Sequence, residues 1–449
     1  MKNLLISIPC ARNVRYFVDT KIFDDIVNYC SQHDIHIHLV HKQETLSNFF
    51  LNNDNITEFH YPEINKSSKL VKLFRNLVNE PSILWKYLFY GRVSPFKISP
   101  RDTLKKNIIR LVLFPFSLLY YLPIICKLIA HFSFYDKNYA YFLMEYQIDA
   151  VILNLPDCIE ERLLSQSCNE MKIPIVAGCD GWDTYLNNGY VHKFAGLMLW
   201  GKDMAIHAKE SGFKENQFIY IGMPHKSRIQ YFMANLDKEQ IRKKYNIDKN
   251  DKVILIPCNR WYQTNDMEKN FIEALLQFIE NNKEINYIII LRDNPGGIPR
   301  KEDIDYKIIY KNNKYIRFQV PVKSFMDSWT GFIENGIIRE VAELFLISDC
   351  LFSITSLFLL EAAISNIPVN LYNIKKEKYN VRYATKKKFY KSLLNIGISE
   401  LTDYNDIPIF LNKKDNLEYL KNISIAYDYY EPNYIEKLFH LLRLDNNKI

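Results

Sequence analysis

Two aspartates and a tryptophan lie close together in the stretch AGCDGWDTYLNNG, residues 177–189. Asp180 and Asp183 are three residues apart, Trp182 lies between them, and the apolar run Ile173–Val176 precedes them. A carboxylate can act as a general base that deprotonates a hydroxyl group for attack, and an aromatic ring can stack against the apolar face of a sugar. Asp180 and Asp183 are therefore candidate catalytic bases and Trp182 a candidate acceptor contact. The alternative is that one aspartate only caps the following helix.

Two arginines follow the first apolar run that we expect to form a strand. Arg12 and Arg15 come after the run Asn3–Pro9, in a loop that opens a helix, where backbone N–H groups already favour an anion. They are candidate contacts for an acidic group of an acceptor; the alternative is that they are two surface arginines.

Two more arginines occupy the ends of expected strands in the second half of the chain. Arg260 follows the run Lys252–Cys258, and Arg292 ends the run Asn286–Arg292. A guanidinium group pairs well with phosphate oxygens, so two of them at adjacent strand ends could hold a diphosphate.

The segment SDCLFSITSLFLLEAAISNIPV, residues 348–369, reads as strand, hydroxyl residues, helix and strand. The hydroxyls of Thr355 and Ser356 and the first N–H groups of the helix could receive a phosphate. Glu361 falls in the second turn, where its carboxylate could accept hydrogen bonds from two ribose hydroxyls. The alternatives are ordinary helix capping for Thr355 and Ser356 and a favourable interaction with the helix dipole for Glu361.

Apolar runs that alternate with helical stretches must position these residues. Such runs predict parallel sheets covered by helices on both faces. In the first half the expected strands are Asn3–Pro9, Asp34–Val40, Asp149–Leu155, Ile173–Gly178, Ala195–Gly201 and Phe218–Pro224. In the second half they are Lys252–Cys258, Asn286–Arg292, Tyr315–Val320, Cys350–Ile354 and Pro368–Asn373.

The predicted fold is therefore α/β, with two Rossmann-like domains that face each other across a cleft. The polar, charged stretch Ala234–Asp251 suggests the boundary, with domains 1–235 and 236–449. Ligands of open α/β sheets bind beyond the carboxyl ends of the strands, so we expect the site residues to follow the strands of both domains. The C-terminal helix Ile435–Leu444 could pack back on the first domain.

An apolar insertion near residues 108–132 interrupts the first domain. Its centre, Leu111–Cys126, has no charged residue but is too short for a membrane-spanning helix and contains two prolines. It predicts either buried core or a surface that contacts the membrane interface. Most of the 8 cysteines lie in apolar runs and none form a CxxC pair, which indicates a reducing compartment. We expect a cytoplasmic protein with peripheral contact to the inner face of the plasma membrane.

Several classes of protein are disfavoured. The formal net charge of +7 is too small for a dedicated nucleic-acid binder. The chain has no GxGxxG or GxxxxGK[ST] sequence, which disfavours classical dinucleotide and P-loop sites. His33, His36, His38 and His41 straddle an expected strand without a nearby cysteine, so we expect no metal site there.

The segment 347–369 resembles the nucleotide-diphosphate-binding segment of GT-B glycosyltransferases. It is also similar to the related segments of non-hydrolysing UDP-N-acetylglucosamine 2-epimerases and of CDP-glycerol glycerophosphotransferases. Upstream, the Asp-x-Trp-Asp sequence at Asp180–Asp183, the Trp-Gly that ends a strand and the Gly-x-Pro at Gly222–Pro224 resemble bacterial surface-polysaccharide glycosyltransferases of this fold. The family's loop usually continues Trp-Asp-Asn, and its strand tip often reads Arg-x-His-Pro; here they read Trp-Asp-Thr and Arg292-Asp-Asn-Pro.

The resemblance implies a metal-independent transferase without a cofactor. It also implies that domain 236–449 binds the donor, a nucleotide-sugar, and that domain 1–235 binds the acceptor. The acceptor would be a glycan or lipid-linked glycan of a capsule, a lipopolysaccharide or a similar cell-surface polymer. Transfer of a phospho-polyol from a CDP-linked donor and epimerisation of a nucleotide-sugar are the alternative reactions on the same fold.

Overall fold

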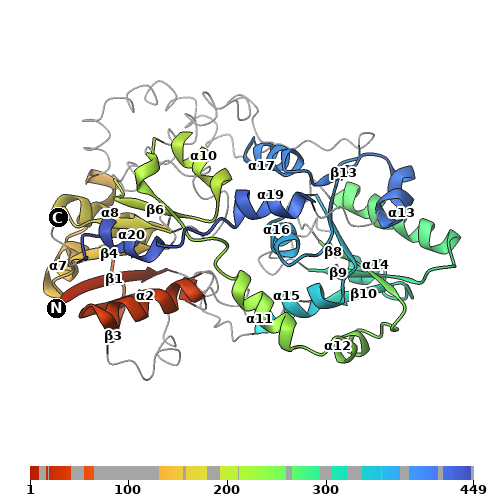
Figure 1. Cartoon of the computed structure of the whole chain (residues 1–449), viewed down its shortest axis with the longest axis horizontal. Helices are drawn as coiled ribbons and strands as arrows, with labels where there is room; N and C mark the ends of the chain where they lie inside the picture. The colour runs from red at the N-terminus through yellow and green to blue at the C-terminus, as the bar shows by residue number, and fades with distance from the viewer. Residues whose placement is uncertain are drawn as a thin grey trace. The chain divides into compact units, whose positions relative to one another are not determined.

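The computed structural model describes residues 1–9, 17–18, 20–41, 55–64, 131–154, 158–178, 193–210, 212–258, 265–293, 305–320, 336–354, 356–374, 384–412 and 418–445 of the 449-residue chain. The chain divides into two compact units, each with its own sheet (Figure 1). Unit 1 comprises Met1–Gly222, Arg382–Thr385 and Tyr429–Ile449, and unit 2 comprises Met223–Val381 and Lys386–Asp428.

Unit 1 is built on a parallel sheet with the strand order β3-β2-β1-β4-β5-β6-β7. The strands are β1 (Lys2–Ile8), β2 (Ile35–His41), β3 (Ile56–His60), β4 (Ala150–Leu153), β5 (Ile175–Ala177), β6 (Gly196–Leu199) and β7 (Phe218–Tyr220). The helices are α2 (Lys21–Gln32), α7 (Lys137–Glu145), α8 (Ile159–Met171), α10 (Lys202–Glu210) and α20 (Tyr434–Leu441), with a 3-10 turn η2 (Glu215–Gln217).

Unit 2 repeats this plan with the order β10-β9-β8-β11-β12-β13, again all parallel. The strands are β8 (Lys252–Pro257), β9 (Tyr287–Arg292), β10 (Ile316–Gln319), β11 (Cys350–Ser353), β12 (Val369–Tyr372) and β13 (Ser399–Leu401). The helices are α11 (Lys226–Asn235), α12 (Lys238–Lys244), α13 (Asn265–Asn281), α14 (Tyr306–Ile309), α15 (Gly336–Ile347), α16 (Leu357–Ile364), α17 (Ala384–Asn395), α18 (Ile407–Asn412) and α19 (Glu418–Tyr427), with a 3-10 turn η4 (Tyr404–Asp406).

The two strand orders confirm the predicted Rossmann-like architecture of both halves. In each sheet the second and third strands in sequence add one after the other on one side of the first strand. The fourth strand then pairs with the other side of the first strand. The order therefore reverses between β1 and β4 and between β8 and β11. Ligands of such sheets bind outside the carboxyl ends of the strands at this point of reversal.

Burial on both faces explains why the apolar runs form the central strands. All four residues of β4 and all six of β9 are buried, as expected for a parallel sheet covered on both sides. The expected strands all occur, with their ends shifted by up to four residues; most are shorter than expected, whereas β1 and β2 are shifted by one residue along the chain. Two strands at sheet edges, β3 and β13, were not predicted; β3 has no fully buried residue.

The C-terminal helix α20 belongs to unit 1. The ring of Phe439 stacks on Tyr29 of α2 with 4.0 Å between centroids, and Tyr434 donates a hydrogen bond to Asp25. Leu441 lies so close to β6 that a Cβ atom at Gly196 would be 2.7 Å from its Cδ1 atom, which explains the glycine in an otherwise bulky strand.

The chain passes from unit 1 to unit 2 between Gly222 and Met223 and returns between Asp428 and Tyr429. The sequence predicted a boundary between residues 235 and 236. That position lies between α11 and α12, and both helices are part of unit 2. On the unit 2 side, Asp428 accepts a hydrogen bond from the Met223 N–H (3.0 Å) and pairs with Lys226. The carboxylate of Asp428 therefore ties the two chain segments together where they enter unit 2.

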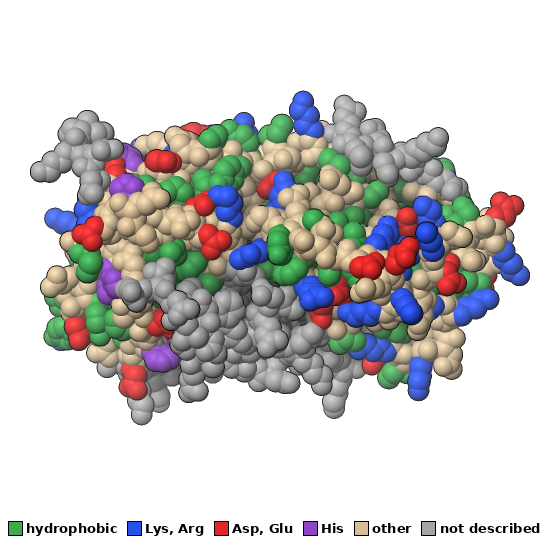
Figure 2. Space-filling model, turned by 60° about the horizontal axis from the view of Figure 1, so that its bottom comes forward, with side chains coloured by type: hydrophobic (Ala, Val, Ile, Leu, Met, Phe, Trp, Pro, Cys, Tyr) green, Lys and Arg blue, Asp and Glu red, His purple; other side chains and the backbone are tan. Residues whose placement is uncertain are grey.

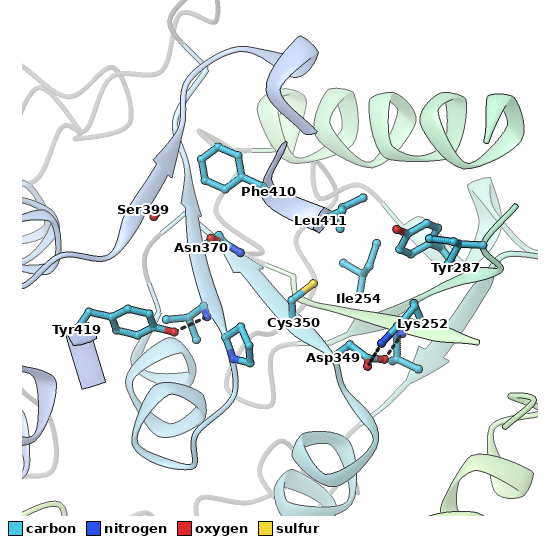
Figure 3. A pocket seen from close by; sticks show the side chains of 14 residues that line it. Lys252, Ile254, Tyr287, Asp349, Cys350, Asn370, Ser399, Phe410, Leu411 and Tyr419 are labelled. Atoms are coloured by element: carbon cyan, nitrogen blue, oxygen red, sulfur yellow. Dashed lines mark hydrogen bonds and ion pairs between the residues drawn. The ribbon is translucent and has the colours of Figure 1, made fainter. Parts of the chain in front are cut away.

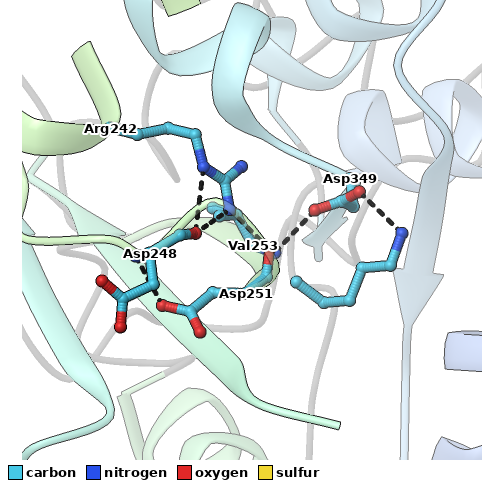
Figure 4. A network of polar contacts seen from close by, with 6 residues as sticks. Arg242, Asp248, Asp251, Val253 and Asp349 are labelled. Carbon is cyan, nitrogen blue, oxygen red and sulfur yellow. Dashed lines mark hydrogen bonds and ion pairs between the residues drawn. The ribbon is translucent and has the colours of Figure 1, made fainter. Parts of the chain in front are cut away.

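Arg242 anchors α12 to the start of β8 (Figure 4). Its buried guanidinium group donates through Nη2 to the backbone carbonyls of Asp248 and Asp251, both at 2.6 Å, and through Nε to Asp248 at 3.2 Å. The Asp251 carboxylate in turn accepts from the Asp248 N–H at 2.8 Å. This forked pairing fixes the turn that leads into the central strand of unit 2.

Charges of both signs are mixed over unit 2 on the face drawn in Figure 2. Several lysines of this unit are paired, including Lys244 with Glu343 at 2.6 Å and Lys252 with Asp349 at 3.1 Å.

Among the described residues, none of the helices is both long and apolar enough to cross a bilayer. The apolar run Leu111–Cys126 lies outside the described residues.

Candidate functional site

Arg292 is presented at the carboxyl edge of the unit 2 sheet. It is the last residue of β9 and pairs in register with Gln319, the last residue of β10. Its backbone carbonyl accepts a hydrogen bond from the Cys258 N–H at 2.8 Å, just beyond the end of β8. The Arg292 side chain is only 4% exposed, so its charge is held inside the edge of the sheet.

The Arg292 guanidinium group lies over an aromatic ring of α16. Its central carbon is 4.5 Å from the ring centroid of Phe358, which is in the first turn of that helix. A guanidinium over an aromatic face is attracted by about 0.5–2 kcal/mol. The contact therefore places the positive charge of Arg292 next to the N-terminal turn of α16, where the helix dipole also favours an anion.

Ser356 is the N-cap of α16. Its backbone is extended, with φ −152° and ψ 145°, and its hydroxyl oxygen accepts a hydrogen bond from the Phe358 N–H at 3.2 Å. The capping role that the sequence left open is thus present. A serine hydroxyl that accepts one hydrogen bond keeps its own proton to donate, so the cap can also bind an anion at the helix end.

Glu361 lies one turn further along α16 and is bound by a histidine. His225 Nε2 donates a hydrogen bond to Glu361 Oε1 at 2.8 Å. The imidazole is fully buried and the glutamate is 3% exposed. With Glu361 as a carboxylate, which only accepts, the hydrogen of this bond lies on Nε2 of the imidazole. Glu361 therefore has a fixed orientation within the first turns of α16.

These residues bring an anion-binding helix end, a buried guanidinium and a buried carboxylate to one region of unit 2. Arg292 contacts Phe358, Ser356 caps the same turn, and Glu361 follows on the same helix. The sequence assigns Arg292, Ser356 and Glu361 to the donor, and that assignment stays a prediction. Arg292 ends β9, Ser356 caps α16 after β11, and Glu361 lies within α16, beside the point where the strand order reverses.

The remaining predicted site residues lie outside the described residues. They are Arg12, Arg15, Asp180, Trp182, Asp183, Arg260 and Thr355. Their assignments stay predictions.

At the corresponding edge of unit 1, a buried glutamate joins the ends of β1 and β4. Glu161, in the first turn of α8, accepts hydrogen bonds from the Ser7 hydroxyl and from the Asn154 N–H, the latter at 2.9 Å. The Asn154 amide donates to the Ser7 carbonyl at 2.8 Å, and the Tyr61 hydroxyl also pairs with Ser7. Burial and the nearby Glu161 raise the pKa of Tyr61 well above 10, so the phenol stays protonated.

Sequence reasoning missed both His225 and this network. His225 is 136 residues away from Glu361, and a buried glutamate such as Glu161 looks like any acid in a first helical turn. The only local signal for His225 is its place directly after the Gly-x-Pro sequence at the start of α11.

Among the described residues, no group of three or more His, Cys, Asp and Glu side chains could hold a metal ion.

No family model and no curated protein matches this chain. Solved structures do match over almost its whole length. Staphylococcus aureus MnaA in complex with UDP is 12% identical and aligns with 100% of this chain and 99% of its own, with a TM-score of 0.52. A glycosyltransferase from Rickettsia africae is also 12% identical, covers 99% of both chains and has a TM-score of 0.52. A UDP-N-acetylglucosamine 2-epimerase is 10% identical, covers 98% of this chain and 96% of its own, and has a TM-score of 0.50.

These matches, together with the two strand orders, establish a GT-B glycosyltransferase-like fold. At identities of 10–12% the similarity defines the architecture and leaves the reaction to be argued from the site.

Proposed function

We propose that this protein is a glycosyltransferase that moves a sugar from a nucleotide-sugar donor to a growing cell-surface glycan. The observation that carries the proposal is the Glu361 carboxylate, buried in α16 and held by His225 at 2.8 Å, in the helix whose first turn is capped by Ser356 and contacted by Arg292. A carboxylate of fixed orientation can accept from a diol, while the helix end and the guanidinium attract phosphate.

In this proposal unit 2 binds the nucleotide half of the donor. Glu361 accepts hydrogen bonds from the ribose hydroxyls, and Ser356 with the N-terminus of α16 binds a phosphate. Arg292 neutralises the diphosphate, which is the leaving group, and so lowers the barrier to its departure. Arg260 and Thr355 are assigned to the same diphosphate from their positions in the sequence.

Unit 1 would bind the acceptor, a glycan or a lipid-linked glycan. Asp180 or Asp183 takes the proton from the attacking hydroxyl as a bond forms to the anomeric carbon of the donor sugar and the bond to the diphosphate breaks. Trp182 stacks against an acceptor sugar, and Arg12 and Arg15 contact an acidic group. The reaction needs no metal ion or cofactor in this scheme, and the protein would work in the cytoplasm at the inner face of the membrane.

Epimerisation of a UDP-sugar is a second candidate, and a specific observation favours it. A UDP-N-acetylglucosamine 2-epimerase shares the whole fold at a TM-score of 0.50, close to the value for the Rickettsia glycosyltransferase. Such a reaction needs the same nucleotide site but no acceptor.

The first experiment measures binding of UDP and other nucleotides to the full chain by calorimetry. We expect Glu361→Gln to weaken nucleotide binding by about tenfold, because a charged hydrogen-bond acceptor is lost. Glu343→Gln is the matched control, since Glu343 is also a buried, ion-paired acid of unit 2 but lies on α15. If no nucleotide binds, or both variants bind alike, the proposed nucleotide site is wrong.

The second experiment identifies the products from nucleotide-sugars with and without added glycan acceptors. Release of the nucleotide that depends on an acceptor supports the glycosyltransferase. Conversion of a UDP-sugar to its C2 epimer without an acceptor supports the epimerase instead. Release of CMP from a CDP-polyol would identify a phosphotransferase and would contradict both.

A further inference from the structure

A cavity of about 340 Å³ lies at the amino ends of the unit 2 strands (Figure 3). Its lining includes the first residues of β8, β9, β11, β12 and β13, together with Phe410 and Leu411 of α18 and Tyr419 of α19. Arg292, Ser356 and Glu361 lie toward the opposite, carboxyl edge of the same sheet. The cavity is therefore separate from the proposed nucleotide site, and its volume is in the range of small-molecule pockets.

Asn370 of β12 gives this cavity a polar centre. The residue is 8% exposed, and in Figure 3 its side chain lies between Phe410 and Cys350 among the lining side chains. Within the described part of the chain its side-chain amide has no hydrogen-bond partner. A ligand group that forms a hydrogen bond with this amide would gain about 0.5–1.5 kcal/mol.

The surroundings of Asn370 favour a positive charge. The helices α13, α15 and α16 end immediately before β9, β11 and β12, so their C-termini, which carry partial negative charge, point to this edge of the sheet. Asp349 adds a carboxylate, and the Lys252 ammonium group already lies 3.1 Å from it at the rim. A cation inside the cavity would be attracted by these three helix ends, whereas Lys252 and the N-terminal turn of α19 at Tyr419 oppose it.

The remaining lining favours a flat apolar body. Tyr287, Phe410 and Tyr419 contribute aromatic rings, and aliphatic side chains such as Ile254 and Leu411 complete the wall. The Tyr419 hydroxyl accepts a hydrogen bond from the Val369 N–H at 3.2 Å, which fixes that ring at one side of the cavity. Aromatic faces also attract ammonium groups directly.

We propose that this cavity binds a small organic ammonium ion with an aromatic body. The ammonium group donates a hydrogen bond to the side-chain carbonyl of Asn370, and the body lies between Phe410 and the tyrosine rings. The Lys252–Asp349 ion pair borders the entrance, and Lys252 competes with the ligand for the local negative field. The inference does not depend on the reaction at the other edge of the sheet.

The test compares three probes of similar shape on the full-length protein by calorimetry at neutral pH: 2-phenylethylamine, 2-phenylethanol and phenylacetate. We expect the amine to bind, the neutral alcohol to bind about tenfold more weakly, and the anion not to bind. Equal binding of amine and alcohol, or no saturable binding of the amine, overturns the proposal.

Variants then locate the site. Asn370→Leu should weaken the amine about tenfold, whereas Asn370→Asp and Lys252→Met should tighten it, because each makes the cavity more negative. Asn422→Leu, on the exposed side of α19, is the matched control and should bind like the unaltered protein. The increase in affinity can only come from folded protein, so a loss through misfolding cannot imitate the full pattern. An unchanged affinity in Asn370→Leu and Asn370→Asp contradicts the assignment.

The thiol of Cys350 provides a second readout, since this residue lines the cavity and is partly exposed. We expect 2-phenylethylamine to slow modification of Cys350 by a small thiol reagent, with the modified residue identified by mass spectrometry. Modification at an unchanged rate under saturating amine places the amine elsewhere and overturns the site.

Discussion

The His225–Glu361 hydrogen bond leads to the first residue-scale prediction. Both side chains are buried, so removing the imidazole leaves the Glu361 carboxylate without the hydrogen bond from His225 and with little access to water. We expect His225→Ala to lower the free energy of unfolding by about 1–3 kcal/mol and to weaken nucleotide binding as well. Urea unfolding and calorimetry measure the two effects.

The control for this change is His225→Gln, whose side-chain amide can still donate. Partial recovery of both stability and nucleotide affinity would indicate that the hydrogen bond matters, rather than the volume of the ring. Full nucleotide affinity in His225→Ala would show that Glu361 does not need His225 for orientation.

The sequence alone singles out Glu361 as a candidate site residue but does not single out His225, for a physical reason. Glu361 sits at a fixed spacing within a local pattern of strand, hydroxyl residues and helix, so its neighbours in the sequence identify it. His225 acts through a partner 136 residues away, and only the folding of unit 2 brings them together. The same limit applies to the Ser7–Glu161 contact, which joins residues 154 positions apart.

His38 leads to a prediction about pH. Burial, together with the neighbouring His36 ring at 4.7 Å between centroids, lowers the pKa of its imidazole to about 4. In the unfolded chain the pKa is near 6.5, so the unfolded state binds more protons between these two values. Stability therefore falls as the pH drops from 6.5 to 4 and is unaffected by this group above that window.

The measurement is the free energy of unfolding as a function of pH for the unaltered protein and for His38→Leu. We expect the variant to lose less stability between pH 6.5 and 4, by about 1–2 kcal/mol after allowance for screening by solvent. Titration of the His38 ring by NMR gives a direct check. A ring that titrates at or above its ordinary pKa contradicts the prediction.

At the scale of elements, the connection from α12 to β8 depends on one guanidinium. Arg242 uses two nitrogens on two backbone carbonyls, a geometry that a lysine ammonium cannot reproduce. We expect Arg242→Lys to lower the free energy of unfolding by about 2 kcal/mol, with unpaired carbonyls left behind. Urea unfolding tests this, with the exposed Lys243→Arg on the same helix as control. Equal stability of both variants would rule out this anchoring role.

The elements that the sequence predicted correctly are the ones with a strong physical signal. A strand such as β9 is buried along its full length and must be apolar throughout, so it is visible without any partner. The missed strands β3 and β13 lie at sheet edges and pair on one side only. Their short or polar sequences, ITEFH and SEL, carry little of that signal, because an edge strand buries less surface.

At the scale of the whole molecule, the six-strand order of unit 2 also occurs in unit 1, which adds β7 at one edge. The chain crosses between the units at Gly222–Met223 and again at Asp428–Tyr429. Because of the second crossing, the C-terminal residues from Tyr429 onward belong to unit 1. Unit 2 consists of the chain between the two crossings, except for residues 382–385. Each unit thus has its own core, and the proposed nucleotide site belongs entirely to unit 2.

This division predicts which unit is protected when a nucleotide without its sugar binds. UDP added to the full chain is expected to protect backbone amides of unit 2 from hydrogen exchange, at the end of β9, the first turn of α16 and the start of α11 around His225. A ligand that binds only the native state raises the free energy of opening for the segments it contacts. In unit 1, the amides of β1, β4 and α8 are expected to exchange at an unchanged rate.

Hydrogen exchange followed by mass spectrometry measures both units in one experiment, and Glu361→Gln serves as the control in which the protection should largely disappear. Because β1 and α8 frame the buried Ser7–Glu161 network, they report on unit 1 at the edge where the acceptor is proposed to bind. Protection by UDP that is centred on these segments would assign the nucleotide to unit 1. The roles proposed for the two units would then have to be exchanged.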